Sequence, residues 1–282
     1  MRVLVTGLDG FTGQYVRREL EIHGHEVVGL KADLTQLDEV KREVDSIQPN
    51  AAMHLAAVSF VEHGDANAFY QVNLIGTRNL LEALSAHSNE VQCVLLASSA
   101  NIYGNARTGT IDESVSPSPV NDYAVSKLAM EQMSRLWMDK LPIVIVRPFN
   151  YTGVGQSASF LLPKIVDHFR RKAEYIELGN LDVARDFSDV RVVASTYRQL
   201  VEQKVIGEVF NVCSGDAFSL SEILEMMADI SGYAIEVKIN PKFVRENEVK
   251  RLAGDGKKLA KHIGEQKQIP LRATLEWMYS AN

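Results

Sequence analysis

The chain has 282 residues, of which 46% are hydrophobic and 23% charged, so it can bury a large core and fits one elaborate domain or two closely joined ones. Its formal net charge of −6 argues against a nucleic-acid partner, and no apolar stretch is long enough to span a bilayer. Because a β-type run begins at Arg2, where a signal region would stand, we expect a cytoplasmic protein.

The first predicted unit is a strand, a glycine-rich turn and a helix. Apolar residues run from Arg2 to Val5, and helical periodicity runs from Tyr15 to Leu20. In a dinucleotide-binding domain, the N–H groups at the start of such a helix receive the pyrophosphate. We therefore predict that the turn binds a cofactor, although a turn that only reverses the chain is the alternative. Its candidate residues have GxxGxxG spacing and are Gly7, Gly10, Phe11, Thr12 and Gly13.

Apolar runs then alternate with helical patterns, which predicts an α/β fold with a doubly wound parallel sheet. The predicted strands span 26–30, 51–55, 91–97 and 143–146, and the predicted helices span 37–47, 69–87 and 123–138. Ligands bind such sheets at the carboxyl ends of the strands. Three of these ends carry distinctive residues: His54-Leu55-Ala56-Ala57, Ser98-Ser99 and Arg147-Pro148-Phe149-Asn150.

The end of the second strand bears on the choice of cofactor. An acidic residue there binds the ribose of NAD, whereas a basic residue favours the 2'-phosphate of NADP. The chain has Leu30-Lys31 at this point and no carboxylate until Asp33. Lys31 therefore favours NADP, with NAD as the alternative, although a solvated lysine is the purely structural interpretation.

A tyrosine and a lysine four residues apart, Tyr123 and Lys127, follow Ser99 by 24 residues or more. On one helix they share a face, so we expect the ammonium of Lys127 to lower the pKa of the Tyr123 phenol. Ser99 would hydrogen-bond the substrate oxygen that gains or loses the proton. An isolated match is common on surface helices, but the glycine turn and the strand ends make a catalytic role for these three residues the better interpretation.

Together these motifs resemble the extended branch of the short-chain dehydrogenase/reductase superfamily along essentially the whole chain. The resemblance implies that Leu55, Ala56, Ala57 and Pro148 line the cofactor site and that Asp33 and Leu34 lie against the adenine. It also implies a Rossmann domain of residues 1–150, to which 186–214 return. A smaller C-terminal α/β substrate-binding domain would comprise 151–185 and 215–282, and we expect a homodimer.

Residues 153–157, 179–190 and 210–215 resemble the members of this family that act on GDP-sugars. The resemblance implies substrate contacts from Asn150, Asn180 and Arg185, whose guanidinium fork suits a diphosphate or the neighbouring nucleotide. A surface salt bridge to Asp182 or Asp189 is the alternative for Arg185. The later Arg245-Glu246-Asn247-Glu248 resembles the family's Arg-Pro-x-Glu segment without its proline, which implies that Arg245 meets phosphate and Glu248 a ribose hydroxyl.

The residues after Ser99 limit the range of reactions that the chain could catalyse. In dehydratases of this family carboxylates directly follow the catalytic hydroxyl, whereas here Ala100 and Asn101 follow it, so 4,6-dehydration lacks a general base. The chain is most similar to GDP-4-keto-6-deoxymannose reductases, which use NADPH to reduce the C4 ketone and form GDP-rhamnose. A nucleotide-sugar 4-epimerase is the enzymatic alternative. An NADP-sensing regulatory protein is the other, although such proteins typically lose the tyrosine and lysine.

The remaining reactive side chains are expected to be structural. Cys93 and Cys213 fall in predicted core strands and should be reduced and buried. The histidines show no metal-ligand spacing, so we expect no metal site. Tyr103 either lines the sugar pocket or packs in the core.

Overall fold

A computed structural model describes residues 1–58, 65–105, 109–243 and 251–281. Its centre is a parallel sheet of six strands in the order β10-β6-β4-β3-β1-β2. This confirms the predicted doubly wound fold. The strands are β1 (Arg2–Thr6), β2 (Glu26–Gly29), β3 (Ala51–His54), β4 (Cys93–Ala97), β6 (Ile143–Pro148) and β10 (Val209–Val212).

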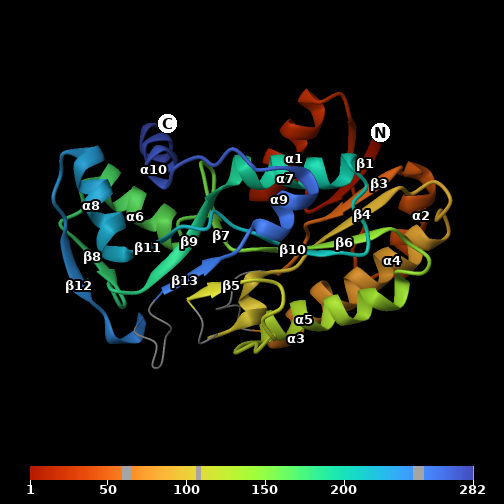
Figure 1. The fold of residues 1–282 in the computed structure, drawn as a ribbon, viewed down its shortest axis with the longest axis horizontal. Coiled ribbons are helices and arrows are strands. Elements are labelled where there is room, and N and C mark those ends of the chain that lie inside the picture. Colours follow the sequence, from red (N-terminus) through yellow and green to blue (C-terminus); the bar gives the residue numbers. More distant parts are fainter. Residues whose placement is uncertain (59–64, 106–108, 244–250, 282) are drawn as a thin grey trace.

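Helices cover both faces of this sheet because successive strand residues point to opposite sides. Val3 and Val5 of β1 face one core, and Leu4 between them faces the other. The first core also takes residues from α1 (Phe11–Ile22), α7 (Val190–Glu202) and α9 (Lys257–Ile263), and the second from α2 (Leu37–Ile47), α4 (Thr77–Ser85) and α5 (Asp122–Ser134). Figure 1 shows these two helical layers above and below the sheet.

The chain before α4 is helical from α3 (Ala66–Phe69) through a π-helix (Tyr70–Gly76), and short 3₁₀ segments span Ala100–Tyr103, Arg135–Trp137 and Pro241–Phe243. Predicted helices and strands agree with the structure to within a few residues at each end.

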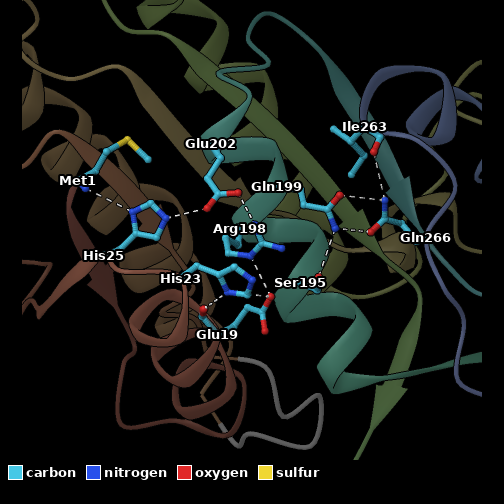
Figure 2. Close-up of polar contacts among 10 residues, drawn as sticks. All are labelled: Met1, Glu19, His23, His25, Ser195, Arg198, Gln199, Glu202, Ile263 and Gln266. Atoms are coloured by element: carbon cyan, nitrogen blue, oxygen red, sulfur yellow. Dashed lines mark hydrogen bonds and ion pairs between the residues drawn. The ribbon is translucent and has the colours of Figure 1, made fainter.

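Polar side chains join the C-terminal half of α1 to α7. Arg198 donates to Glu19 at 2.9 Å and also pairs with Glu202, whose carboxylate lies 2.8 Å from Nε2 of His25. Figure 2 shows these groups pointing toward one another between the two helices. Partly exposed pairs of this kind contribute about 0–1 kcal/mol each. These contacts fix the C-terminal half of α1 to α7. The N-terminal end of α1 lies at the glycine-rich turn.

A second part of the molecule lies beside the carboxyl ends of the central strands (Figure 1). Its larger sheet has the order β11-β9-β13-β5, with β7 also pairing β9. These strands are β5 (Thr110–Ile111), β7 (Asn150–Thr152), β9 (Ala184–Asp189), β11 (Ala217–Ser219) and β13 (Arg251–Gly254).

A third core fills this second part. It takes side chains from α6 (Leu161–Arg170), α8 (Leu220–Ser231) and α10 (Leu271–Ser280), together with the parallel pair β8 (Tyr175–Leu178) and β12 (Glu236–Ile239). The division of the chain into two domains at the expected boundaries stays a prediction. Within the described residues, no helix is both long and apolar enough to cross a membrane.

The two cysteines differ in their position in the fold and in their burial. Cys93 lies buried in β4, as predicted, and burial raises its pKa to about 12. Cys213 follows β10 and is half-buried, so its assignment to a core strand was wrong. Burial raises its pKa too, because removing a thiolate from water disfavours the charged form. Both thiols are unbridged.

Candidate active site

The glycine-rich turn packs directly on the loop that follows β3. Gly7 has φ +71°, and a Cβ atom there would lie 2.8 Å from the backbone nitrogen of Ala56. A Cβ on Gly13 would lie 2.3 Å from the carbonyl oxygen of Gly7. Both positions therefore require glycine, one for its conformation and close approach and the other because α1 begins against the turn.

The start of α1 is suited to an anion. Its N-cap residue, Gly10, supplies no side-chain cap, and its first turn contains no acidic residue. The first N–H groups of a helix have no partner within the helix, and the helix dipole favours negative charge there. This end of α1 thus fits the pyrophosphate of a dinucleotide.

One cavity of about 1320 Å³ extends from this turn, past the carboxyl ends of β3, β4 and β6, into the second part of the molecule. It brings together three groups of predicted residues. Its lining includes Gly7, Gly10, Phe11, Thr12, Gly13, Leu55, Ala56, Ala57 and Pro148 for the cofactor, Ser99, Tyr123 and Lys127 for catalysis, and Asn150, Asn180 and Arg185 for the substrate.

Three other predicted cofactor residues lie outside that lining as far as the structure describes it. Lys31 is exposed directly beyond β2, and its backbone N–H donates to Glu43 at 2.9 Å. Asp33 accepts two hydrogen bonds from Thr35, which lower its pKa, and Leu34 is buried in the second core. Their roles stay predictions. Arg245 and Glu248 fall outside the described residues.

The hydroxyl groups of Ser99 and Tyr123, the predicted catalytic residues, meet where β4 ends and α5 begins. The side chain of Asn121 caps α5 by accepting the N–H of Ala124 at 2.9 Å, which sets Tyr123 in the first turn of the helix. Ser99 lies two residues beyond β4 and hydrogen-bonds to Tyr123. Both side chains are buried at the cavity wall.

The expectation that Lys127 lowers the pKa of Tyr123 was wrong. Burial raises that pKa to about 12, and the opposing effect of the Ser99 hydrogen bond is smaller. Burial also lowers the pKa of Lys127 to about 8, and its Nζ atom donates to the carbonyl oxygen of Ala97 at 2.8 Å. The phenol is therefore protonated near neutral pH, as a proton donor must be.

A buried ion pair lies one turn beyond Lys127. Glu131, fully buried in α5, accepts two hydrogen bonds from Arg147 at 3.0 and 2.7 Å. Arg147 also donates to the hydroxyl of Tyr103, which in turn donates to Asn211. Tyr103 thus packs in the core and does not belong to the described cavity wall. Glu131 was not predicted from the sequence, although its position four residues after Lys127 on the same helix face was a usable signal.

A second network, which was not predicted either, links the loop after β3 to α5. The Thr77 hydroxyl donates its proton to the backbone carbonyl of Asn73. In its contact with His54 it must therefore accept the proton that Nε2 of the ring carries. Nδ1 of His54 lies 2.7 Å from the hydroxyl of Thr6, and burial lowers the pKa of His54 to about 3, which keeps the ring neutral. The Asn73 side chain accepts the N–H of Val58 and donates to the Val58 carbonyl and to the hydroxyl of Ser126. Ser126 directly precedes Lys127 in α5.

On the substrate side, Arg185 lies in strand β9, and its guanidinium donates to the Ala184 carbonyl at 2.9 Å. The neighbouring Asp186 is fully buried and accepts hydrogen bonds from Ser214, Gly215 and Gly254. It thereby fixes the segment after β10 beside β9. Nδ2 of Asn150 donates to the Asp186 carbonyl at 3.2 Å. These contacts hold Asn150 and Arg185 on one wall of the cavity.

Comparison with known proteins yields one family. The model of the NAD dependent epimerase/dehydratase family matches residues 3–213. The chain is 37% identical over 286 residues to GDP-6-deoxy-D-talose 4-dehydrogenase of Aggregatibacter actinomycetemcomitans, covering 99% of this chain and 97% of that protein. It is 33% identical over 295 residues to GDP-6-deoxy-D-mannose reductase of Pseudomonas aeruginosa, covering 99% and 96%.

Two solved structures are similar to this chain over nearly its whole length. RMD from Pseudomonas aeruginosa, complexed with NADPH, superposes with a TM-score of 0.91 at 32% identity, covering 99% of this chain and 97% of that one. A suspected epimerase from Burkholderia cenocepacia J2315 superposes with a TM-score of 0.95 at 50% identity, covering 99% and 96%.

Proposed function

Because the chain belongs to the NAD dependent epimerase/dehydratase family, as its motifs indicated, we propose that it reduces the C4 ketone of a GDP-4-keto-6-deoxyhexose with NADPH. The substrate would be of the GDP-4-keto-6-deoxymannose type and the product of the GDP-rhamnose type. Two relatives at 37% and 33% identity over almost the full chain are named for GDP-6-deoxyhexose chemistry, which supports this class of substrate.

The observation that carries the proposal is the meeting of Ser99, Tyr123 and Lys127 with the glycine-rich turn in one cavity. A protonated phenol beside a serine hydroxyl is what ketone reduction needs, because the carbonyl oxygen gains a proton as its carbon gains a hydride. With a pKa raised to about 12, Tyr123 holds that proton at neutral pH.

The chain's residues fit a nicotinamide dinucleotide. The glycine turn has no room for a Cβ atom at Gly7 or Gly13, and the start of α1 carries neither a side-chain cap nor an acidic residue. When bound, the cofactor supplies the hydride. Solved structures of relatives hold NADPH or NAD, and Lys31 favours the phosphorylated form.

Each catalytic residue has one task in this proposal. Ser99 hydrogen-bonds the ketone oxygen and positions it, and Tyr123 donates its phenol proton to that oxygen. Lys127 donates to the nicotinamide ribose. Asn150, Asn180 and Arg185, with Arg245 and Glu248, bind the GDP-sugar.

The second candidate is a 4-epimerase, favoured by the 50% identity to a suspected epimerase. An epimerase uses the same three side chains but returns the hydride to the sugar, so it consumes no cofactor overall. A cytoplasmic homodimer stays a prediction under either function.

The test is to incubate the purified protein with NADPH and GDP-4-keto-6-deoxymannose, generated in place by a dehydratase, and to follow the nicotinamide absorbance. One NADPH lost per sugar reduced supports the ketoreductase, and NMR of the product then gives the stereochemistry at C4. The epimerase is tested separately, with NAD and a GDP-6-deoxyhexose that carries a hydroxyl at C4, because a 4-ketone has no hydroxyl to invert. Inversion at C4 without net change in the nicotinamide absorbance supports the epimerase. Cofactor binding without any sugar conversion would favour a regulatory protein or another nucleotide sugar.

A further inference from the structure

Tyr151 follows the predicted substrate residue Asn150 but faces the cofactor side. It lines the same cavity, and its hydroxyl oxygen lies 2.9 Å from Oγ1 of Thr12, a residue 139 positions earlier in the chain. Thr12 belongs to the glycine-rich turn and to the first turn of α1. A side chain from the second part of the molecule thus reaches the end of α1 that fits a pyrophosphate.

The phenol of Tyr151 is held in place by its surroundings. Its ring stacks on Phe11, with centroids 6.2 Å apart and planes 11° from parallel. Its backbone lies in β7, opposite Ser188 of β9, and the side chain packs against the first core. The hydrogen bond to Thr12 therefore requires little further loss of side-chain freedom.

Either hydroxyl group could donate in this bond, and the acidities of the two groups favour Tyr151 as the donor. Burial raises the pKa of Tyr151, so the phenol stays protonated and can donate. A phenol is a stronger acid than an alcohol and hence the better donor of the two. With Oγ1 of Thr12 accepting from Tyr151, the hydroxyl proton of Thr12 is available to another acceptor at the start of α1.

We propose that Tyr151 is a positioning residue for the cofactor: its phenol orients Thr12 so that the threonine hydroxyl donates to a phosphate oxygen of the nicotinamide dinucleotide. This inference rests on the proposed cofactor and does not depend on which sugar is the substrate. Because NADPH and NADH share the pyrophosphate, Tyr151 affects the binding of both equally, unlike Lys31.

Tyr15 provides a matched control. It belongs to the same aromatic cluster, with its ring edge-on to Phe11 at 5.5 Å between centroids. Its hydroxyl donates to the carbonyl of Val154 at 2.6 Å, and Tyr15 is not among the described residues that line the cavity. Tyr15→Phe removes a phenol oxygen from this cluster without touching Thr12.

The experiment measures the dissociation constants of NADPH and NADH by fluorescence for the whole protein and for Tyr151→Phe, Thr12→Val, the double variant and Tyr15→Phe. Tyr151→Phe should weaken both cofactors by about five- to tenfold, as expected for one oriented hydrogen bond to a charged group. The double variant should bind no more weakly than Thr12→Val, because the two groups act in series. Tyr15→Phe should stay within about twofold of the natural protein.

Two results would overturn the inference: unchanged cofactor binding in Tyr151→Phe, or losses in the two single variants that add in the double variant. Either would leave the proposed function standing as long as the natural protein binds NADPH. If the natural protein binds neither cofactor, both proposals fall. Melting temperatures of the Tyr151→Phe and Tyr15→Phe variants show whether a change in binding merely follows a loss of folded protein.

Discussion

At the scale of single residues, the active site depends on how burial acts on two titratable groups. The phenol of Tyr123 becomes a weaker acid and the ammonium of Lys127 a stronger one, both because charge is disfavoured away from water. The spacing of Tyr123, Lys127 and Ser99 could be read from the sequence. The Ala97 carbonyl that binds Lys127 could not, because it lies 30 positions away and has no chemical signature.

Replacing Tyr123 by Phe should lower kcat by two or more orders of magnitude, since the ketone oxygen then has no positioned proton donor. Steady-state kinetics measures this, and fluorescence measures the dissociation constant of NADPH, which should stay within about twofold. Equal losses in turnover and in cofactor binding would mean that Tyr123 is structural.

The pKa of about 8 for Lys127 predicts a pH dependence. A lysine is charged below its pKa, so the proposed bond from Lys127 to the nicotinamide ribose would be intact at pH 7 and would weaken as the pH rises through about 8. NADPH should bind more weakly at pH 9 than at pH 7. The pKa values of His54 and Tyr123, about 3 and about 12, lie outside this range.

The control is Lys127→Arg, because a guanidinium stays charged throughout. This variant should bind NADPH more weakly than the natural protein at pH 7 but with no further loss at pH 9. Equally flat profiles for both proteins would contradict a titrating Lys127.

We predict that Lys31 determines the choice between the two cofactors. It stands exposed two residues beyond β2, whose last residue, Gly29, lies against Leu8 of the glycine-rich turn. Lys31→Asp should weaken NADPH by roughly tenfold or more while changing NADH little, because it removes attraction to the 2'-phosphate and adds repulsion. Parallel titrations provide the measurement, and an equal effect on both cofactors would remove the reason for preferring NADP.

At the scale of elements, helix α5 is held by charge as well as by apolar packing. Arg147 at the end of β6 and Glu131 in α5 form a pair with side chains 5% and 0% exposed. Removing one partner of a buried pair leaves the other charge without compensation. The pair thus fixes the helix that carries Tyr123 and Lys127 against the sheet.

Glu131→Ala should lower the free energy of unfolding by about 3–5 kcal/mol, because it strands the Arg147 guanidinium in the core. Urea unfolding measures the change. Glu276→Ala is the control, since its pair with Arg272 lies at the surface and should contribute about 1 kcal/mol or less. Similar losses in the two variants would show that Glu131 is not held as a buried ion.

The helices and strands of the central sheet were predictable because each follows from a local pattern of apolar residues. The predicted helix over 37–47 coincides with α2, and that over 123–138 with α5 and the 3₁₀ turn after it. The pairing of β9 with β7, β11 and β13 could not be foreseen. It joins segments far apart in the chain and depends on contacts such as those of Asp186.

At the scale of the whole molecule, one cavity joins three sets of residues recognised separately in the sequence. The glycine turn and the strand ends fix its cofactor side, and their positions follow from the rule that parallel sheets bind ligands at the carboxyl ends of their strands. The residues on its substrate side could be predicted only from the resemblance to a known family. Tyr151 could not be found from the sequence because its role depends on Thr12, in a different part of the fold.

The most direct test of the central claim is the transfer of label from the cofactor to the sugar. The protein would be mixed with GDP-4-keto-6-deoxymannose and with NADPH that carries deuterium at both C4 hydrogen positions of the nicotinamide, and the product analysed by NMR. We predict one deuterium at C4 of the GDP-6-deoxyhexose for each NADPH oxidised. A product without deuterium at C4 would contradict the proposed ketone reduction.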